Sequence, residues 1–409
     1  MIKREIYIDR IKPFINKDII KVLTGIRRSG KSFMLKLIME ELEKNGVERE
    51  KFININFENL KYKSLCTAEA LNNFILSKAK KNERYYLFLD EIQEVVEWEK
   101  CINSLRADEE YNFDIYITGS NAKLLSGELS TYLAGRYVEF IIYPFSFKEF
   151  IEAMKTTYED INIQEIFKKY ILFGGMPFLH NLNFNEEASM QYLKDMYSSI
   201  ILKDITQRNN IRDIDLLERI ISYVIMNIGN TFSATSLSKY FKSENRKASP
   251  ETILNYIKAC EEAMLIYRVQ RNDLIGKKIL SVNEKYYIAD HGIRQAVFEN
   301  NERDINQIFE NIVYLELLRR GYSVKIGKID DLEVDFVCTK GRDETKYIQV
   351  AYLLASPETV EREFSVLEKI QDNYPKFVIS MDFFDMSRNG IKHMNIIEFL
   401  LNTACLLLH

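Results

Sequence analysis

Cysteine and histidine are scarce in this sequence of 409 residues, and those present are widely separated. The five cysteines form no Cys-x-x-Cys pair, and the four histidines are equally dispersed. Structural zinc sites need closely spaced ligands, and disulfide frameworks need a pairing pattern. The spacing therefore argues against both and indicates reduced thiols in a cytoplasmic protein. The residues concerned are Cys66, Cys101, Cys260, Cys338, Cys405, His180, His291, His393 and His409.

Long apolar runs are also missing. No segment reaches the ~20 apolar residues that a membrane-spanning helix needs. The charged start Met1–Glu5 is followed by no apolar stretch of the kind found in secretory signals. The C-terminal run Ile396–Leu408 is apolar but short, so we expect it to form a helix packed on the last domain. These absences favour a cytoplasmic protein with no membrane partner.

An excess of one charge sign is missing as well. The 56 Lys and Arg residues nearly balance the 60 Asp and Glu residues, which gives a formal net charge of -4. This balance argues against a protein that coats nucleic acid by bulk charge, although a local basic face remains compatible with it. The composition is that of an ordinary globular protein, and the length suggests two to four domains.

Short apolar runs alternate with helical patterns through residues 1–145. Because such strands are almost continuously apolar, the alternation predicts an α/β domain with a parallel sheet covered on both faces. The expected strands are Ile19–Leu23, Phe52–Phe57, Tyr85–Leu89, Phe113–Thr118 and Val138–Ile142, and the expected helices are Lys31–Lys44 and Ala68–Lys80.

Three further regions follow this core. Residues 146–213 have helical periodicity and are expected to form a helical lid or connector. Residues 214–299 show three helical patterns and then two strands, the order of a winged-helix domain. Residues 300–409 begin with a helix and continue with short strands, which predicts a small α/β domain. Its expected elements are a helix at Ile308–Arg320, strands at Val324–Ile326, Glu333–Cys338, Tyr347–Ala351 and Phe377–Ser380, and a final helix.

A phosphate-binding motif follows the first expected strand. It matches G-x-x-x-x-G-K-S without a mismatch, and a helical pattern follows it, as a P-loop requires. Glycines let successive N–H groups face a phosphate, the lysine binds the β- and γ-phosphates, and the serine hydroxyl coordinates Mg²⁺. The motif consists of Gly25, Ile26, Arg27, Arg28, Ser29, Gly30, Lys31 and Ser32.

The two arginines inside this loop leave two interpretations open. Arg27 and Arg28 either face solvent or the lid, or one of them contacts phosphate or a neighbouring subunit.

Two acids end the apolar strand Tyr85–Leu89. Asp90 is placed to hold Mg²⁺, and Glu91 to orient and deprotonate the water that attacks the γ-phosphate. The alternative is that both acids merely begin the next helix. An intact P-loop on the same sheet favours the catalytic interpretation.

Polar residues also end the strand Phe113–Thr118. Asn121, or Ser120 before it, is expected to contact the γ-phosphate or the attacking water. A β-α pair lies between the P-loop strand and the Asp90 strand, an arrangement of additional-strand ATPases. No N-K-x-D motif for guanine follows, so ATP is favoured over GTP.

Arg136 lies just before the last strand of this domain. It is either an arginine finger acting on a neighbouring subunit, which would require a homo-oligomer, or an arginine in a surface or intrachain salt bridge.

Together these motifs resemble those of the prokaryotic AAA-type ATPases whose C-terminal half is a DUF4143 domain. The resemblance rests on the P-loop, on Leu89–Gln93 with Trp98, on Thr118–Asn121 and on Leu133–Arg136 followed by Tyr143-Pro144-Phe145. It continues through Phe173–Pro177, Asp290-His291-Gly292 and Glu333–Phe336. It implies an ATPase core, a winged helix and a C-terminal restriction-endonuclease-like domain.

The expected winged helix carries a local basic excess. Between Lys239 and Lys285 there are ten Lys or Arg and six Asp or Glu residues, an excess of four positive charges. The helix Glu251–Glu262 is a candidate recognition helix for DNA. The alternative is a module that only packs or binds protein.

The endonuclease-like pattern is incomplete. An active site of this fold needs a helical Glu, a strand Asp and then Glu-x-Lys, and Glu310 and Asp335 fit the first two positions. The third reads Gln349-Val350-Ala351, so we expect an inactive domain with a binding or scaffold role.

The sequence therefore predicts an ATP- and Mg²⁺-dependent hydrolase that drives or switches its C-terminal domains. The alternatives are an ATP-gated regulatory module with negligible turnover and a metal-dependent nuclease.

Overall fold

The computed structural model describes residues 2–120, 135–158, 162–274, 278–298, 304–341 and 344–402. It divides the chain into two compact units. Unit 1 comprises Met1–Tyr143 with Glu262–Met264, and unit 2 comprises Pro144–Glu261 with Leu265–His409. The sequence predicted four domains, a finer division than these two units, and that finer division stays a prediction.

Unit 1 is built on a parallel five-stranded sheet with the order β2-β3-β4-β1-β5. All five residues of β1 are buried, because this central strand has a neighbour on each side and is covered on both faces. The parallel sheet expected from the alternating pattern is thus confirmed. The strands are β1 Ile20–Thr24, β2 Phe52–Asn56, β3 Arg84–Asp90, β4 Asn112–Thr118 and β5 Tyr137–Ile141.

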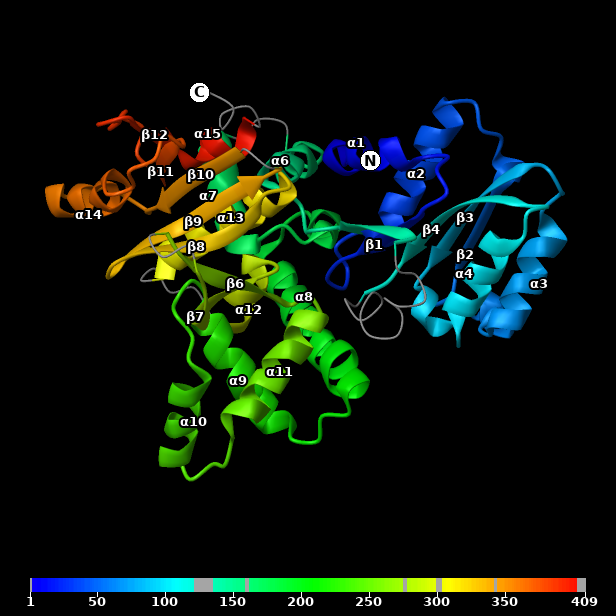
Figure 1. The fold of residues 1–409 in the computed structure, drawn as a ribbon, viewed down its shortest axis with the longest axis horizontal. Helices are drawn as coiled ribbons and strands as arrows, with labels where there is room; N and C mark the ends of the chain where they lie inside the picture. Colours follow the sequence, from blue (N-terminus) through cyan, green and yellow to red (C-terminus); the bar gives the residue numbers. More distant parts are fainter. Residues whose placement is uncertain are drawn as a thin grey trace. The chain divides into compact units, whose positions relative to one another are not determined.

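Helices cover both faces of this sheet. Figure 1 shows α1 and α2 on one side of it and α3 and α4 on the other. The α3–α4 side holds an apolar core that includes Leu71, Leu87 and Trp98. The helices are α1 Glu5–Ile11, α2 Lys31–Lys44, α3 Ala68–Lys78 and α4 Trp98–Ala107.

Unit 2 contains a mixed seven-stranded sheet with the order β12-β11-β10-β9-β8-β6-β7. The pairs β6–β7, β8–β9 and β9–β10 are antiparallel, and the pairs β6–β8, β10–β11 and β11–β12 are parallel. The strands are β6 Ile266–Asp273, β7 Lys278–Ile288, β8 Ser323–Ile329, β9 Leu332–Lys340, β10 Glu344–Val350, β11 Lys376–Ser380 and β12 Ile391–Asn395.

The helices of unit 2 come from four stretches of chain. They are α6 Phe147–Lys155, α7 Ile163–Phe173 and α8 Glu186–Ser199, which a π-helix at Ile200–Gln207 extends; then α9 Ile214–Met226, α10 Ala234–Ser243 and α11 Pro250–Glu262; then α12 His291–Phe298 and α13 Ile305–Arg319; and finally α14 Pro357–Glu368 and α15 Ile396–Leu401. The start of the apolar run Ile396–Leu408 is therefore helical, as expected.

The helices predicted as a lid are part of unit 2. Helices α7 and α8 pack against α12, and α6 packs against α15. A role over the ATPase core therefore stays a prediction.

The element order expected of a winged helix is present, as α9, α10, α11, β6 and β7. Its hairpin is no separate wing, because Arg271–Asp273 of β6 pair with Ile326–Lys328 of β8. The unit 2 sheet therefore crosses the predicted boundary after residue 299, and the winged-helix and endonuclease-like assignments stay predictions.

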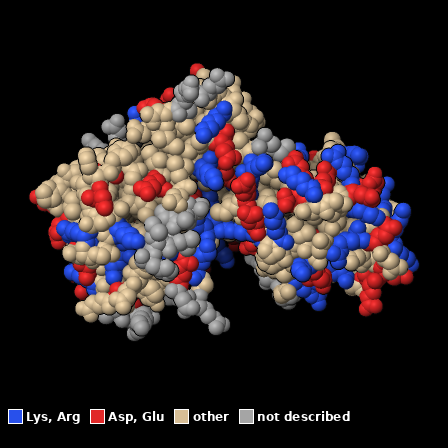
Figure 2. Space-filling model, turned by 90° about the horizontal axis from the view of Figure 1, so that it is seen from above, with Lys and Arg blue, Asp and Glu red and all other residues tan. Residues whose placement is uncertain are grey.

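Charges of both signs are mixed on one face of unit 1. On the face drawn in Figure 2, Lys and Arg residues are interspersed with Asp and Glu residues over this unit, at the right of the view. Within the described part of the chain, no helix combines the length and apolarity needed to cross a bilayer.

Candidate nucleotide-binding site

The P-loop leaves β1 at Thr24 and ends where α2 begins at Lys31. Its two glycines are required by geometry. Gly25 has φ 146° and Gly30 has φ 100°, in the left-handed region that other residues avoid. A Cβ on Gly25 would lie 2.3 Å from the carbonyl oxygen of Ile142, so the loop packs directly on the backbone after β5.

Lys31 points back over this loop. Its Nζ donates hydrogen bonds to the carbonyl oxygens of Gly25, at 3.1 Å, and Ile26, at 3.2 Å. The residue is 4% exposed, so a buried ammonium lies at the start of α2, where the helix dipole also favours an anion.

Asp90 and Ser32 lie together at the carboxyl edge of the sheet. Asp90 is buried, and burial raises the pKa of its carboxyl against the opposing hydrogen bonds from Thr118 and Ser32. Thr118 Oγ1 donates to Asp90 Oδ1 at 2.5 Å, and Asn56 Nδ2 donates to Asp90 Oδ2 at 2.8 Å. A hydroxyl beside a carboxylate fits Mg²⁺, which takes oxygen ligands and uses few protein groups beside a phosphate.

Glu91 is held in a strained backbone conformation, with φ 56° and ψ 51°. Its N–H donates to Thr118 Oγ1 at 2.9 Å, and its carboxylate accepts a short hydrogen bond from Gln93 Nε2. Residues kept in the left-handed region cost about 1–3 kcal/mol and gather at functional sites. The strain at Glu91 therefore points to a role beyond beginning the next helical turn.

Thr118 and Gln93 are site residues that the sequence did not identify by role. Thr118 is fully buried at the end of β4 and joins the backbone of Glu91 to the carboxylate of Asp90. Gln93 lies two residues from Glu91 and orients its side chain. The motif Leu89–Gln93 contained Gln93, but no spacing rule assigns it this contact.

The other predicted site residues are placed as follows. Arg27 is half-buried and Arg28 is exposed, with φ 67°. Ser120 is buried at the end of β4, whereas Asn121 lies outside the described residues. Arg136 is exposed, and its carbonyl accepts from Ile20 N at 2.9 Å. Because β5 runs parallel to β1, Arg136 lies at the opposite edge of the sheet from the P-loop of its own chain.

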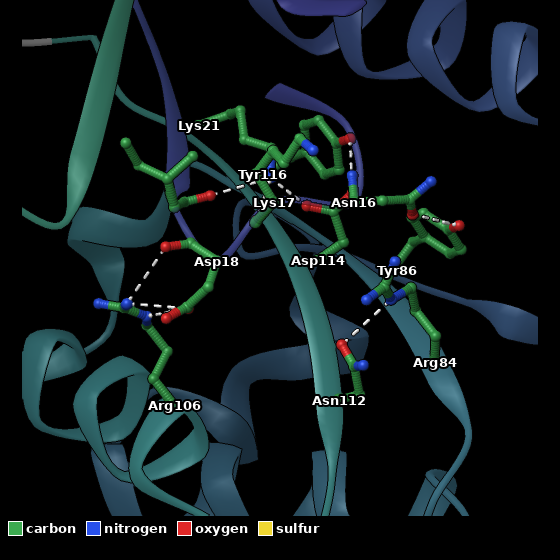
Figure 3. A network of polar contacts seen from close by, with 11 residues as sticks. Asn16, Lys17, Asp18, Lys21, Arg84, Tyr86, Arg106, Asn112, Asp114 and Tyr116 are labelled. Atoms are coloured by element: carbon green, nitrogen blue, oxygen red, sulfur yellow. Dashed lines mark hydrogen bonds and ion pairs between the residues drawn. The ribbon is translucent and has the colours of Figure 1, made fainter. Parts of the chain in front are cut away.

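That opposite edge holds a polar cavity of about 300 Å³. Figure 3 shows the side chains around it, including Arg84 and Arg106. Beside it lies a fully buried ion pair between Lys21 and Asp114. Asp114 also accepts hydrogen bonds from Asn16 N at 2.8 Å and from the hydroxyl of Tyr116 at 3.0 Å. This network ties the amino ends of β1 and β4 together.

Unit 2 contains a second cavity, of about 370 Å³, lined among others by Glu310, Asp335, Gln349 and Ala351. The predicted endonuclease-like residues are therefore brought together. The Asp335 N–H donates to Gln349 Oε1 at 3.1 Å, and the Val350 N–H donates to Asp335 Oδ2 at 2.8 Å.

Lys285 of β7 places its ammonium beside two carboxylates that line this cavity, those of Glu310 and Glu333. Its Nζ lies 3.7 Å from Glu310 and 2.5 Å from Glu333. Burial raises the pKa of Glu310 and, well above its usual range, that of Asp335. The expected motif places its lysine on the strand of Gln349, and no spacing in the sequence points to a lysine on β7. Among the described residues, no group of three His, Cys, Asp or Glu side chains is arranged to hold a metal ion.

Comparisons with known proteins agree with this geometry. Residues 17–151 match the family model of an AAA domain, AAA_14. A Haemophilus influenzae protein is 37% identical over 98% of this chain and 99% of its own length. A Methanocaldococcus jannaschii protein, MJ1544, is 33% identical over 87% of this chain and 81% of its own length. The chain belongs to the family of these two proteins.

Both relatives are described as uncharacterized, so they establish family membership and no activity. This chain has an AAA-type P-loop ATPase fold. The Walker-type ATPase PABY2304 of Pyrococcus abyssi shares that fold, with a TM-score of 0.51, 17% identity, and coverage of 72% of this chain and 95% of that chain.

The part of this chain after the AAA domain matches a family model other than the expected DUF4143. Residues 164–304 match a domain of unknown function, DUF8612. The resemblance to DUF4143 proteins is therefore not confirmed.

Proposed function

We propose that this chain is an ATP hydrolase that binds Mg²⁺–ATP and uses turnover to drive or switch unit 2. The observation that supports it most is the meeting of Lys31, Ser32 and Asp90 at one edge of a parallel sheet. The AAA domain match over residues 17–151 supports it independently. The proposed preference for ATP over GTP rests on the absence of an N-K-x-D guanine-binding motif from the sequence.

Each residue has a proposed role in this reaction. The P-loop N–H groups and the Lys31 ammonium bind the β- and γ-phosphates and stabilise the charge that develops on transfer. Ser32 and Asp90 would hold Mg²⁺, which neutralises phosphate charge when bound. Glu91, oriented by Gln93, polarises the attacking water and accepts its proton.

Two further residues are proposed on weaker grounds. Asn121 would orient the γ-phosphate or the water from the end of β4. Arg136 lies at the opposite sheet edge, so a finger role requires the nucleotide of a neighbouring copy. In that case the active form is an oligomer, and ATPase turnover per chain rises with protein concentration.

Replacing Glu91 with Gln tests the hydrolase directly. The amide cannot accept the proton, so phosphate release should fall by a factor of about 10²–10⁴ while ATP affinity stays near that of the wild type. Glu94→Gln is the matched control, because Glu94 is exposed three residues away. Tight ATP binding by wild-type protein without phosphate release would support the regulatory module instead.

For unit 2 we propose a binding role. The basic excess between Lys239 and Lys285 supports contact with nucleic acid through α10 and α11. Nuclease activity is less well supported, because Gln349 and Ala351 replace the expected Glu and Lys, and the Lys285 ammonium already pairs with Glu310 and Glu333. Wild-type protein and Asp335→Ala should leave DNA equally intact with Mg²⁺ or Mn²⁺. Cleavage by the wild type alone would establish the nuclease.

A further inference from the structure

Arg4 is a buried charge that the proposed reaction does not use. It precedes α1 in unit 1 and is 1% exposed. A guanidinium out of water is costly unless its N–H groups find partners, so its contacts identify what it is there to hold.

Two partners of Arg4 are backbone carbonyls far apart in the sequence. Nη1 donates to the carbonyl oxygen of Ser29 at 3.0 Å, and Nη2 donates to that of Tyr143 at 2.7 Å. The guanidinium carbon lies 4.6 Å from the centre of the Tyr7 ring. The hydroxyl of Tyr7 accepts from Tyr143 N at 3.1 Å. Arg4 and Tyr7 therefore connect the P-loop to Tyr143 at the end of unit 1.

Ser29 lies inside the P-loop and is fully buried. Its hydroxyl is buried and makes no hydrogen bond with the described residues. Its carbonyl accepts from Arg4, and its N–H donates to the carbonyl oxygen of Ile26 at 3.2 Å, so Arg4 is one of the contacts that hold this part of the loop. On the other side, Gly25 packs against the carbonyl of Ile142.

The orientation of the Ser29 carbonyl decides where the next N–H points. The peptide bond is planar and trans, so the Ser29 C=O and the Gly30 N–H point in opposite directions. Because the Ser29 carbonyl points at Arg4, the Gly30 N–H points away from Arg4, and a phosphate bound by the N–H groups of the loop would lie on that side. If this peptide rotated, a carbonyl oxygen would replace a donor and repel the phosphate.

We propose that Arg4 is a positioning residue that sets the Ser29–Gly30 peptide in the orientation that binds phosphate. The proposal rests on the proposed nucleotide site. An arginine suits this position because two separate guanidinium nitrogens donate to the two carbonyls, Nη1 to Ser29 and Nη2 to Tyr143, whereas a lysine would have to reach both from one nitrogen.

The test compares Arg4→Gln and Arg4→Lys with the wild type in the full-length chain. Lys3→Gln is the matched control, since Lys3 is exposed next to Arg4. We would measure the dissociation constant of Mg²⁺–ATP and of Mg²⁺–ADP, kcat and KM, and hydrogen exchange over residues 25–32. The melting temperature without nucleotide reports folding separately.

Arg4→Gln should weaken the binding of both nucleotides about tenfold to a hundredfold, because the charge-assisted hydrogen bond that orients the Ser29 carbonyl is lost. Arg4→Lys should weaken them less, and KM should rise more than kcat falls. Exchange over residues 25–32 should speed up, and Lys3→Gln should match the wild type.

Two outcomes would overturn the role of Arg4. One is a folded Arg4→Gln or, if that variant does not fold, a folded Arg4→Lys that binds both nucleotides like the wild type. The other is a lower melting temperature with unchanged affinity per folded molecule, which indicates a structural role only. Failure of the proposed function is distinguishable, because then the wild type itself would bind no nucleotide.

Discussion

The buried ion pair of Lys21 and Asp114 stabilises the sheet of unit 1 at the edge opposite the P-loop. Both side chains are excluded from solvent, and burial lowers the pKa of Lys21 while Asp114 opposes that shift. Removing one partner of a buried pair leaves the other uncompensated, which is far more costly than losing a surface pair.

Asp114→Asn should therefore lower the free energy of unfolding by about 3–5 kcal/mol. Urea unfolding measures this, with Glu109→Gln as the control, because Glu109 lines the same cavity but is exposed. The control should change stability by less than about 0.5 kcal/mol. If Asp114→Asn is as stable as the control, the ion pair is not what holds these strands.

At this scale the sequence identified residues that chemistry requires in a fixed pattern, and it missed those that act through distant contacts. The P-loop and Asp90 follow from local spacing. Arg4, Thr118 and the Lys21–Asp114 pair join positions 25 to 139 residues apart, and one sequence contains no spacing that reports such contacts.

At the scale of elements, a glycine turn locks α7 to α12 in unit 2. Asp290 Oδ2 accepts from Gly175 N at 2.7 Å, and Oδ1 accepts from Gly292 N at 3.0 Å. A Cβ on Gly174 would lie 2.1 Å from Asp290 Oδ1, and one on Gly292 would lie 1.9 Å from the carbonyl oxygen of Phe173. The motifs Phe173–Pro177 and Asp290-His291-Gly292 thus form one contact.

This contact should make stability depend on pH. Burial raises the pKa of Asp290 from 3.8 to about 7. A raised folded-state pKa means that its stabilising contribution is complete below the unfolded pKa, near 4, and is lost as pH rises through about 7.

Asp290→Asn tests that sign. The amide can accept at only one of its two positions, so the variant should be less stable than the wild type at pH 5. Because the wild type alone loses stability between pH 4 and 7, the difference in urea midpoint should shrink at pH 8. His291 is present in both proteins and cancels in the difference. A gap that widens with pH would contradict the raised pKa.

Some elements were not predicted from sequence periodicity, among them α4, although its buried residues Trp98, Cys101, Ile102 and Leu105 follow the helical period. Helix α12 is buried over most of its length, so no polar face revealed it. Strand β12 has only five residues at the edge of its sheet. Helix α14 is different, because Ser356 caps it and Pro357 opens it, a start signal that was present in the sequence.

For the whole molecule, the structure divides into two compact units, and the four domains expected from pattern changes stay a prediction. Strands β6 and β8 pair within one sheet across the expected boundary after residue 299. Pairing between strands distant in the chain cannot be read from local composition.

Two compact units predict two unfolding transitions in calorimetry, because cooperativity follows the units. A non-hydrolysable ATP analogue with Mg²⁺ binds folded unit 1 in our proposal, so at a hundred times its dissociation constant it should stabilise that unit by about 2.7 kcal/mol. Only one transition should then move upward, and Lys31→Ala should abolish that movement. If both transitions move upward together, the free energy of nucleotide binding stabilises both units. Unit 2 would then be coupled to the P-loop in the folded protein before any turnover.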